Sequence, residues 1–520
     1  MRADSEATAP EWRSDDVAPP DGSAWDLLVV GGGTAGIVAA KTAAGFGAQV
    51  LLVEQNRPGG DCLWTGCVPS KAILAAAHAA ADARAAHRFG IGIVDVEVDF
   101  AAVMTHVRRT ITAIEPADSP AALRAAGIRV ANATARFTGP DTADVAGTEV
   151  RFRQALLATG ATPVMPSIPG LAETNLLTSE TVWSLGELPK RLLVLGGGGI
   201  GCELGQAFAR LGSSVTIVES ASRLLPREDE DAAAVVTEAL IADGVSVRTG
   251  VSLNRITLAA PGRDAGWPED AEDAEAFLIP AATPRSGWRA SLADGSETVF
   301  DAVLVAVGRR PRTVGLGLAE AGVVLDDSGH VRVDGRLRTS NPRISAAGDV
   351  TGHPPFTHTA GVHGSLAATN AILGLRRTVD IATMPRVTFT QPEVAAFGVS
   401  AERADRFGLT VRTVRHGEVD RAVAEGHVAG FTRLVLDRRS RVVGATIVGP
   451  RAGESLAEVV LAARHGLRAR DIAASTHAYP TYGDGVWKAA IEQVVQQLRS
   501  PGTAWTMRAL SRVRRRWLAR

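Results

Sequence analysis

Residues 28–36 read Leu28-Val29-Val30-Gly31-Gly32-Gly33-Thr34-Ala35-Gly36, and residues 193–201 repeat the pattern 165 positions later as Leu193-Val194-Leu195-Gly196-Gly197-Gly198-Gly199-Ile200-Gly201. In each copy an apolar run typical of a strand enters a glycine turn, and a second apolar run ends in an acid at the same distance from that turn. Such glycines permit a tight bend, a close approach of backbone to a pyrophosphate at a helix N-terminus, and packing of the helix on the strand, while the acid accepts from a ribose hydroxyl. The alternative, two βαβ units without a ligand, is disfavoured because the full pattern occurs twice. The sequence therefore predicts two dinucleotide-binding α/β folds, one using Gly31, Gly33, Gly36 and Glu54 and the other using Gly196, Gly198, Gly201 and Glu219.

Length and composition fit an α/β enzyme of about three domains. The chain has 520 residues, 46% hydrophobic residues and a formal net charge of -1, a balance that argues against a nucleic-acid binder. Residues 1–24 are expected to form a disordered N-terminal extension, and residues 259–287 form an acidic insertion without periodicity. From Met384 onward, alternating apolar strands followed by a helical pattern predict a separate α+β domain.

A pair of cysteines stands in the stretch Gly59-Gly60-Asp61-Cys62-Leu63-Trp64-Thr65-Gly66-Cys67-Val68-Pro69-Ser70-Lys71. Along a regular helix their Cα atoms would lie roughly 8 to 9 Å apart, beyond the roughly 7 Å limit for a disulfide. The segment must therefore leave the helix between them, and Gly66 permits this. Pro69 suits a first helical turn, so Cys67 is expected at a helix N-terminus, where a thiolate is favoured. We interpret the pair as a redox-active dithiol.

Other uses of the two cysteines fit less well. Three cysteines in 520 residues are too few for a disulfide-stabilised secreted fold, and no further ligands at short spacing complete a zinc site, so no metal is predicted. The polar N-terminal segment does not resemble a signal peptide, and no apolar run reaches eighteen residues. We expect a cytoplasmic protein, in a compartment where a paired-cysteine motif turns over.

Together these stretches resemble the class I pyridine nucleotide-disulfide oxidoreductases, which include dihydrolipoamide dehydrogenase, glutathione reductase and mercuric reductase. The resemblance runs from about Trp25 to Gln497, and it also rests on Ala158-Thr159-Gly160, Val307-Gly308-Arg309-Arg310-Pro311 and the run from Thr339 to Asp349. It implies two Rossmann-like domains, for FAD and NAD(P), and a C-terminal α+β dimerisation domain. The implied parts are an FAD domain of residues 25–164 and 308–380, an NAD(P) domain of 165–307, and an interface domain of 384–498 in a homodimer.

The resemblance also assigns cofactor contacts. It places the ADP half of FAD on the first glycine turn with Glu54, and the flavin ribitol on Asp349. Thr357 and His358 begin a helix that points at the flavin pyrimidine edge, where its dipole stabilises negative charge. The other residues that it assigns to FAD are Gly60, Lys71, Thr159, Gly160 and Gly308.

NAD(P)H is assigned to the second turn. Glu219 would accept from a 2′-hydroxyl and repel a 2′-phosphate, so NADH is favoured over NADPH, although Arg223 keeps NADPH open. Lys71 and Glu203 match positions that form an ion pair beside the flavin in relatives; an ordinary surface lysine and helix glutamate are the alternative. The implied chemistry is hydride transfer to FAD and electron transfer to the dithiol, with Cys67 as charge-transfer thiolate and Cys62 as interchange thiol.

The C-terminal domain departs from the family pattern of His-Pro-Thr followed by Glu. Here Thr476-His477-Ala478-Tyr479-Pro480-Thr481-Tyr482-Gly483-Asp484 places Tyr479 in the histidine position and Asp484 in the glutamate position. A phenol is a poor base at neutral pH but donates protons and hydrogen bonds, and His477 would point to the same side as Tyr479 on an extended segment. The additional C-terminal cysteine pair of mercuric reductases is absent from the sequence. Beside the dithiol, Asp61 is expected to raise the pKa of Cys62.

Residues 499–520 form a basic tail in which Met507, Leu510, Val513 and Trp517 recur at helical spacing among arginines. This is typical of an amphipathic segment on anionic lipid, giving a peripheral membrane contact; a frayed tail, or one docked on its own dimer, is the alternative. The sequence as a whole predicts an NAD(P)H-dependent flavoprotein reducing a small disulfide, metal-ion or quinone-type acceptor. Dihydrolipoamide dehydrogenase, and a redox-responsive binding protein without turnover, are the alternatives.

Overall fold

The computed structural model describes residues 17–19, 22–259 and 287–519. The predicted disorder of residues 1–16 and 20–21, and the character of the insertion at 260–286, lie outside these ranges. The described chain forms two compact units. Among the described residues, the first comprises 17–19, 22–167, 176–188 and 304–379, and the second comprises 168–175, 189–259, 287–303 and 380–519.

The first unit is built on a sheet whose strand order is β3-β2-β1-β6-β5-β4, with β17 also paired to β6. Strand β1 runs parallel to β2 and β6, in the register Leu28 to Leu51 and Leu28 to Ala155. These strands are almost entirely buried, as expected for parallel strands covered on both faces. Their bounds are β1 Trp25–Val30, β2 Val50–Glu54, β3 Ile128–Asn132, β4 Ala135–Phe137, β5 Thr142–Val145, β6 Thr148–Leu157 and β17 Ile344–Ala346.

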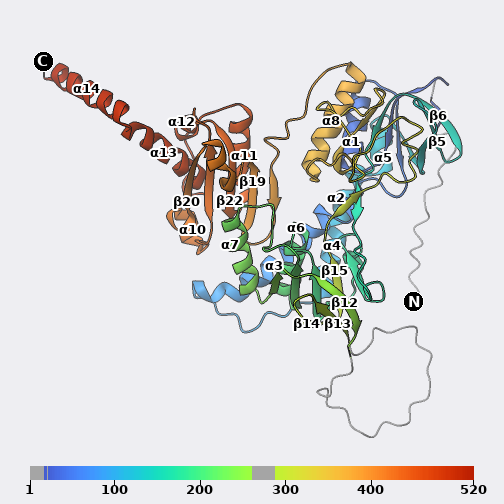
Figure 1. Ribbon diagram of the computed structural model, residues 1–520, viewed down its shortest axis with the longest axis horizontal. Coiled ribbons are helices and arrows are strands. Elements are labelled where there is room, and N and C mark those ends of the chain that lie inside the picture. Colours follow the sequence, from blue (N-terminus) through green and yellow to red (C-terminus); the bar gives the residue numbers. More distant parts are fainter. Residues whose placement is uncertain (1–16, 20–21, 260–286, 520) are drawn as a thin grey trace, which may run out of the picture. The chain divides into compact units, whose positions relative to one another are not determined.

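Two helices of this unit, α1 and α8, lie side by side (Figure 1). They pack through alanines and glycines, and a Cβ atom on Gly364 would lie 2.2 Å from the carbonyl oxygen of Ala35, so the two backbones are in direct contact. The helices of the unit are α1 Thr34–Gly45, α2 Gly60–Trp64, α3 Cys67–Ala85, α4 Phe100–Ile114, α5 Pro120–Ala125 and α8 Thr357–Leu373, with a 3-10 turn η5 at Gly348–Thr351. A ribbon of β7 Ala161–Pro163 and β16 Arg309–Pro311 completes it, and β8 covers Leu176–Thr178.

The second unit contains the repeated nucleotide fold. Strand β10 runs parallel to both β9 and β11, in the order β11-β10-β9-β15. An antiparallel sheet, β12-β13-β14, follows. The elements are β9 Arg191–Leu195, α6 Gly199–Leu211, β10 Ser214–Glu219, α7 Glu230–Ala242, β11 Ser246–Thr249, β12 Leu253–Leu258, β13 Trp288–Leu292, β14 Glu297–Phe300 and β15 Ala302–Val305.

The C-terminal part of this unit is an antiparallel sheet of order β18-β19-β22-β21-β20, packed against α11 and α13. This agrees with the α+β pattern predicted from Met384 onward. Its strands are β18 Arg386–Thr388, β19 Glu393–Gly398, β20 Thr410–Arg415, β21 Phe431–Leu436 and β22 Val442–Gly449. Its helices are α9 Ala401–Ala404, α10 Asp420–Glu425, α11 Ala452–Arg464, α12 Ala469–Ala473, α13 Asp484–Arg499 and α14 Pro501–Leu518.

A buried ionic cluster joins the two parts of the second unit. Arg433 on β21 donates from Nη1 to Asp229 Oδ2 at 2.9 Å and also pairs with Asp231. Thr446 Oγ1 on β22 donates to the same oxygen of Asp229 at 3.0 Å. Because Asp229 immediately precedes α7, this cluster fixes the start of α7 against the C-terminal sheet.

Candidate active site

Both glycine turns have the predicted geometry, and their dimensions are nearly identical. Gly31 and Gly196 have φ angles of 107° and 103°, a region that favours glycine. A Cβ atom on Gly36 would lie 1.9 Å from the carbonyl oxygen of Gly31, and one on Gly201 would lie 1.9 Å from that of Gly196. No larger residue fits at these third glycines without moving the backbone.

The two acids close their turns in the same way. Glu54 Oε2 accepts from the amide of Gly32 at 2.6 Å, and Glu219 Oε2 accepts from the amide of Gly197 at 2.6 Å. Their other oxygens accept from the amides of Asn56 and Ala221, at 2.8 and 2.7 Å. Each carboxylate is thereby held at the end of its strand beside the glycine turn.

The helix N-termini that follow these turns are suited to phosphate. Gly33 and Gly198 are the N-cap residues of α1 and α6, neither helix has a side-chain cap, and neither has an acid in its first turn. The N–H groups of a first helical turn and the helix dipole favour an anion at such a site. In the first unit, the backbone of Gly60 lies directly against the glycine turn, because a Cβ atom there would lie 2.6 Å from the Cα atom of Gly33. The first turn with Glu54 therefore fits the ADP half of FAD, and the second with Glu219 fits a nicotinamide dinucleotide.

The dithiol has the predicted helix break. Helix α2 ends at Trp64, Gly66 takes the non-helical φ and ψ of -124° and -108°, and α3 begins at Cys67. The indole of Trp183 donates to the carbonyl oxygen of Thr65 at 2.9 Å, which fixes the connection. Both cysteines are free thiols, and both are partly buried.

The two thiols differ in their acidity. The pKa of Cys67 is lowered to about 6, chiefly by a hydrogen bond from Cys62, and further by Thr357 and by the charge of Lys71, against the opposing effect of burial. The pKa of Cys62 is raised, because that same hydrogen bond keeps its proton and because burial disfavours its thiolate. Thr357 Oγ1, at the start of α8, lies 3.0 Å from Cys67 Sγ. At neutral pH the reduced pair therefore holds one proton, on Cys62.

Asp61 lies beside Cys62, but Arg309 neutralises it. Arg309 Nη2 donates to Asp61 Oδ2 and also to the carbonyl oxygen of Ala161, the latter at 2.7 Å. The raised pKa of Cys62 has Cys67 and burial as its main causes, so the expected contribution of Asp61 is not among the largest.

Arg309 also lies near Asp349, the residue that is predicted to bind the ribitol of the flavin. Arg309 Nε lies 3.8 Å from Asp349 Oδ2, and this Nε is buried without a hydrogen-bond partner among the described residues. Burial raises the pKa of Asp349, against the opposing charge of Arg309. An unpartnered donor beside a carboxylate fits a polyhydroxyl chain, which both accepts and donates. Arg309 stands inside the stretch at 307–311 on which the family resemblance rests, but the sequence alone did not predict a role for its side chain.

The remaining predicted FAD residues lie in the same unit. Thr159 Oγ1 donates to the carbonyl oxygen of Arg312 at 2.7 Å, and the Arg312 amide donates to Gly160. Gly308, with a φ of 133°, accepts from the amide of Val164. These contacts close the β7–β16 ribbon. His358 stacks on Phe356 with ring centroids 5.3 Å apart.

Lys71 and Glu203 belong to different units. Lys71 lies on α3 and acts electrostatically on Cys67. Glu203 lies on α6 and accepts from the amide of Phe389 at 2.9 Å. Their ion pair stays a prediction.

The three predicted acid/base residues lie close in sequence but have separate partners. His477 Nε2 lies 2.9 Å from Glu458 Oε1, and Nδ1 lies 3.0 Å from the carbonyl oxygen of Ser475. The imidazole ring is thus held between a carboxylate and a backbone carbonyl oxygen, both of which accept hydrogen bonds. Glu458, nineteen residues earlier on α11, was missed from the sequence because nothing local marks it.

Tyr479 and Asp484 differ in exposure. The Tyr479 side chain is 70% exposed and its hydroxyl donates to Asp420 Oδ2 at 2.5 Å, an interaction that raises the pKa of the phenol. Asp484 is buried at the start of α13 and accepts from the amide of Thr481 at 3.4 Å.

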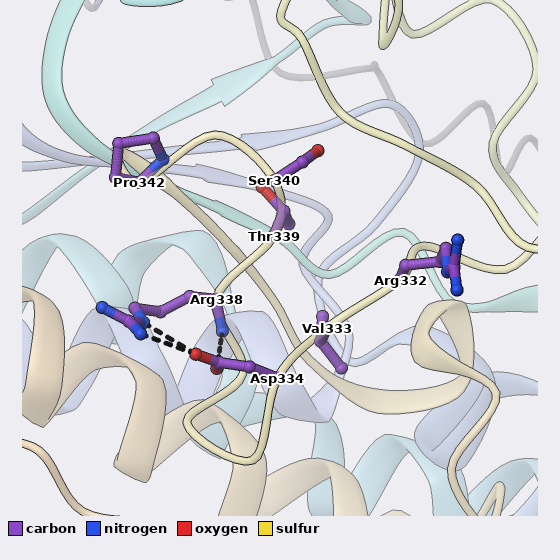
Figure 2. A pocket seen from close by; sticks show the side chains of 7 residues that line it. All are labelled: Arg332, Val333, Asp334, Arg338, Thr339, Ser340 and Pro342. Carbon is purple, nitrogen blue, oxygen red and sulfur yellow. Dashed lines mark hydrogen bonds and ion pairs between the residues drawn. The ribbon is translucent and has the colours of Figure 1, made fainter.

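A surface pocket of the first unit contains none of these residues. Figure 2 shows its lining, and Arg338 donates to Asp334 Oδ2 from Nε at 2.9 Å and from Nη2 at 2.8 Å. The opposite charges of Arg338 and Asp334 compensate each other in this ion pair. Across residues 17–19, 22–259 and 287–519, no group of three or more His, Cys, Asp and Glu could hold a metal ion. Within the same ranges, no helix combines the length and apolar character needed to cross a bilayer.

Comparison with known proteins identifies the class. Residues 25–364 match the family model of pyridine nucleotide-disulphide oxidoreductases, and residues 384–490 match the dimerisation domain of that family. The chain therefore belongs to this family of flavoprotein disulfide oxidoreductases, and both the predicted family and the predicted fold class are confirmed. The family depends on FAD and NAD(P)H, and the dimerisation domain supports a homodimer.

Individual relatives fall into several activities. The chain is 36% identical to a mercuric reductase of Streptomyces lividans, over 90% of this chain and 95% of the relative. It is 35% identical to a dihydrolipoyl dehydrogenase of Geobacillus stearothermophilus, over 89% and 95%. Among solved structures, it resembles LpdA of Mycobacterium tuberculosis (TM-score 0.78, 26% identity, covering 90% and 99%) and a Cu(II) complex of the HOCl-induced flavoprotein disulfide reductase RclA of Escherichia coli (TM-score 0.75, 26% identity, covering 88% and 98%).

Proposed function

We propose that this protein is a homodimeric, cytoplasmic flavoenzyme that passes electrons from NAD(P)H to the Cys62–Cys67 pair and on to a small disulfide, metal ion or quinone. The observation that carries the proposal is the pair formed by Cys62 on α2 and Cys67 at the start of α3, in which Cys67 has a pKa of about 6 and Cys62 keeps its proton. A structural disulfide would not require this polarisation. FAD, when bound on the first glycine turn with Glu54 and Asp349, supplies the two electrons that reduce the disulfide.

The chain's own groups account for the proton and the thiolate. Reduction of the Cys62–Cys67 disulfide by two electrons and one proton leaves a thiol on Cys62 and a thiolate on Cys67. Thr357 and the positive charge of Lys71 stabilise that thiolate. The N-terminus of α3 adds its dipole.

Transfer to a disulfide acceptor then takes two exchanges. Cys62 passes its proton to Cys67 along their hydrogen bond and attacks the acceptor, forming a mixed disulfide and releasing one thiolate. Cys67 loses that proton and attacks Cys62, which re-forms the internal disulfide and releases the second thiolate. The departing thiolates need an acid, and His477, Tyr479 and Asp484 are our candidates.

We propose metal ions as the leading acceptor class. A metal ion bound by the two sulfurs does not have to be protonated before it leaves. Its reduction therefore does not require a strong acid/base residue, and the exposed Tyr479 in the histidine position of the family would not impair it. Similarity to a mercuric reductase and to a Cu(II)-complexed reductase supports this choice. Similarity to a dihydrolipoyl dehydrogenase keeps lipoyl substrates as the second candidate.

We propose NADH as the preferred donor. The carboxylate of Glu219 is held beside the second glycine turn, where it would meet the ribose of a bound dinucleotide. Arg223, the one nearby cation that sequence reasoning left open for a 2′-phosphate, donates to the carbonyl oxygen of Glu228 at 2.9 Å and pairs with Glu402. In steady-state kinetics, kcat/KM should be higher with NADH than with NADPH. Glu219→Ala should reduce the ratio of these two values, because it removes the charge that repels the 2′-phosphate of NADPH.

An acceptor screen tests the proposal. Purified holoenzyme would be assayed with NADH and NADPH against Hg(II), Cu(II), lipoamide, glutathione disulfide and a quinone, alongside Cys62→Ser and Cys67→Ser. Metal-ion turnover that both substitutions abolish supports the proposal. Turnover with lipoamide alone would identify the second candidate, and negligible turnover with every acceptor would favour a redox-responsive binding protein.

A further inference from the structure

The C-terminal helix α14 has an apolar face without cover among the described residues. It spans Pro501–Leu518, and no residue in it is buried. Its large apolar side chains are between 48% and 72% exposed, namely Trp505, Met507, Leu510, Val513, Trp517 and Leu518. Large exposed apolar groups gathered on one short helix mark an interaction surface.

The helix has two distinct faces. At about 100° per residue, Arg508, Arg512, Arg515 and Arg516 fall within an arc of about 100°. Met507, Leu510, Val513, Trp517 and Leu518 fall within an opposite arc of about 140°. Arg514 lies inside the apolar arc, where its guanidinium covers the Trp517 ring at 4.3 Å from the centroid. Trp505 stands on the arginine side.

We propose that α14 binds the surface of an anionic lipid bilayer, lying parallel to it with the apolar face in the headgroup region. The arginines complement anionic headgroups, and there is no acid anywhere from Pro501 to Ala519 to oppose them. Trp517 and the stem of Arg514 have the apolar body and polar tip that suit the interface.

Other partners explain only one face each. A nucleic acid would engage the arginines and leave the apolar arc in water. A second copy of α14 would cover the apolar arc but leave the arginines on the opposite arc without a partner. The lipid surface accounts for both, and this inference does not depend on the acceptor or on the proposed reaction.

Flotation of full-length holoenzyme with vesicles tests it. The vesicles would be phosphatidylcholine alone or with phosphatidylglycerol, at low salt and at about 0.5 M salt, where surface charge is screened. The variants are Arg515→Gln/Arg516→Gln, which removes charge, and Leu510→Ser/Trp517→Ser, which removes apolar area. Arg438→Gln/Arg439→Gln, on the exposed turn between β21 and β22, is the matched control for loss of two arginines.

The wild type and the control should float with phosphatidylglycerol vesicles at low salt. Both tail variants should lower the partition coefficient about tenfold or more. For the arginine variant this is the scale expected for two basic residues near an anionic surface, and for the apolar variant it reflects the lost apolar area. FAD content and NADH oxidation should be unchanged. Absence of flotation, flotation that survives either tail variant, or conversion of a dimer to a monomer by these variants without lipid binding would each overturn the proposal.

Discussion

Removing the hydroxyl group of Thr357 should raise the pKa of the Cys67 thiol. Thr357 Oγ1 lies 3.0 Å from Cys67 Sγ, and it is among the groups that lower the pKa of Cys67 to about 6. A hydrogen bond to a charged group contributes about 1.5–3 kcal/mol, and one pKa unit corresponds to about 1.4 kcal/mol. Thr357→Val, which is nearly isosteric, should therefore raise the pKa of Cys67 by about one to two units, to about 7–8.

The chain offers a clean measurement of this shift. The pKa values of Cys62 and Cys202 are both raised well above the neutral range, so Cys67 is the one cysteine expected to ionise between about pH 4 and 8. Thiolate absorbance in the ultraviolet, followed on anaerobically reduced holoenzyme, would give its titration directly. Because the folded pKa is lowered, the thiolate is present above it and is lost as pH falls through it.

Thr357→Ser keeps the hydroxyl and is the matched control. It should titrate near the wild type, with FAD content and near-ultraviolet circular dichroism unchanged in both variants. A pKa that is the same in Thr357→Val and wild type, or an equal shift in Thr357→Ser, would refute the assignment of this hydroxyl.

Three further predictions concern packing, stability and acceptor choice. Gly36→Ala should abolish FAD retention, since its Cβ atom would lie 1.9 Å from a carbonyl oxygen. Gly45→Ala in the same helix has open space around the Cβ position and should bind FAD normally. Equal FAD content in the two purified variants would contradict the packing argument. Asp229→Ala should lower the free energy of unfolding by about 1.5–3 kcal/mol, because it removes one of the two carboxylates that pair with the buried Arg433, while Asp118→Ala, at a half-exposed pair, should cost under about 1 kcal/mol, as measured by urea titration. Tyr479→Phe should leave the unfolding midpoint unchanged and slow turnover with disulfides by about tenfold or more, with little change for metal ions; an equal loss with both acceptors would argue against a proton-donating role.

The sequence predicted what local covalent geometry determines. Glycine spacing and the acid at a fixed distance define each turn, because only glycine accepts a positive φ at Gly31 and a backbone contact at Gly36. The break between Cys62 and Cys67 followed in the same way, from the reach of a helix and a glycine between the two residues.

Pairings across long sequence separations were not predictable. Arg309 meets Asp61 across 248 residues, and Arg433 meets Asp229 across 204. Charged residues of these types are common along the chain, so a single sequence gives no reason to choose one partner over another. The partner of His477 was missed for the same reason, since Glu458 lies on the neighbouring α11 and belongs to no recognisable motif.

The repeated fold also explains where the dithiol lies. In the first copy the chain returns to its turn after the acid, and the amide of Gly59 donates to the carbonyl oxygen of Gly32 at 2.9 Å. In the second copy the equivalent bond runs from Leu225 to Gly197, at 2.8 Å. Both copies thus close the turn with the same backbone contact, but the first continues directly into α2 and Cys62, whereas the second continues toward α7. The segment that carries the dithiol therefore starts at a backbone contact that both nucleotide turns share, and the two copies differ in the segment that follows it.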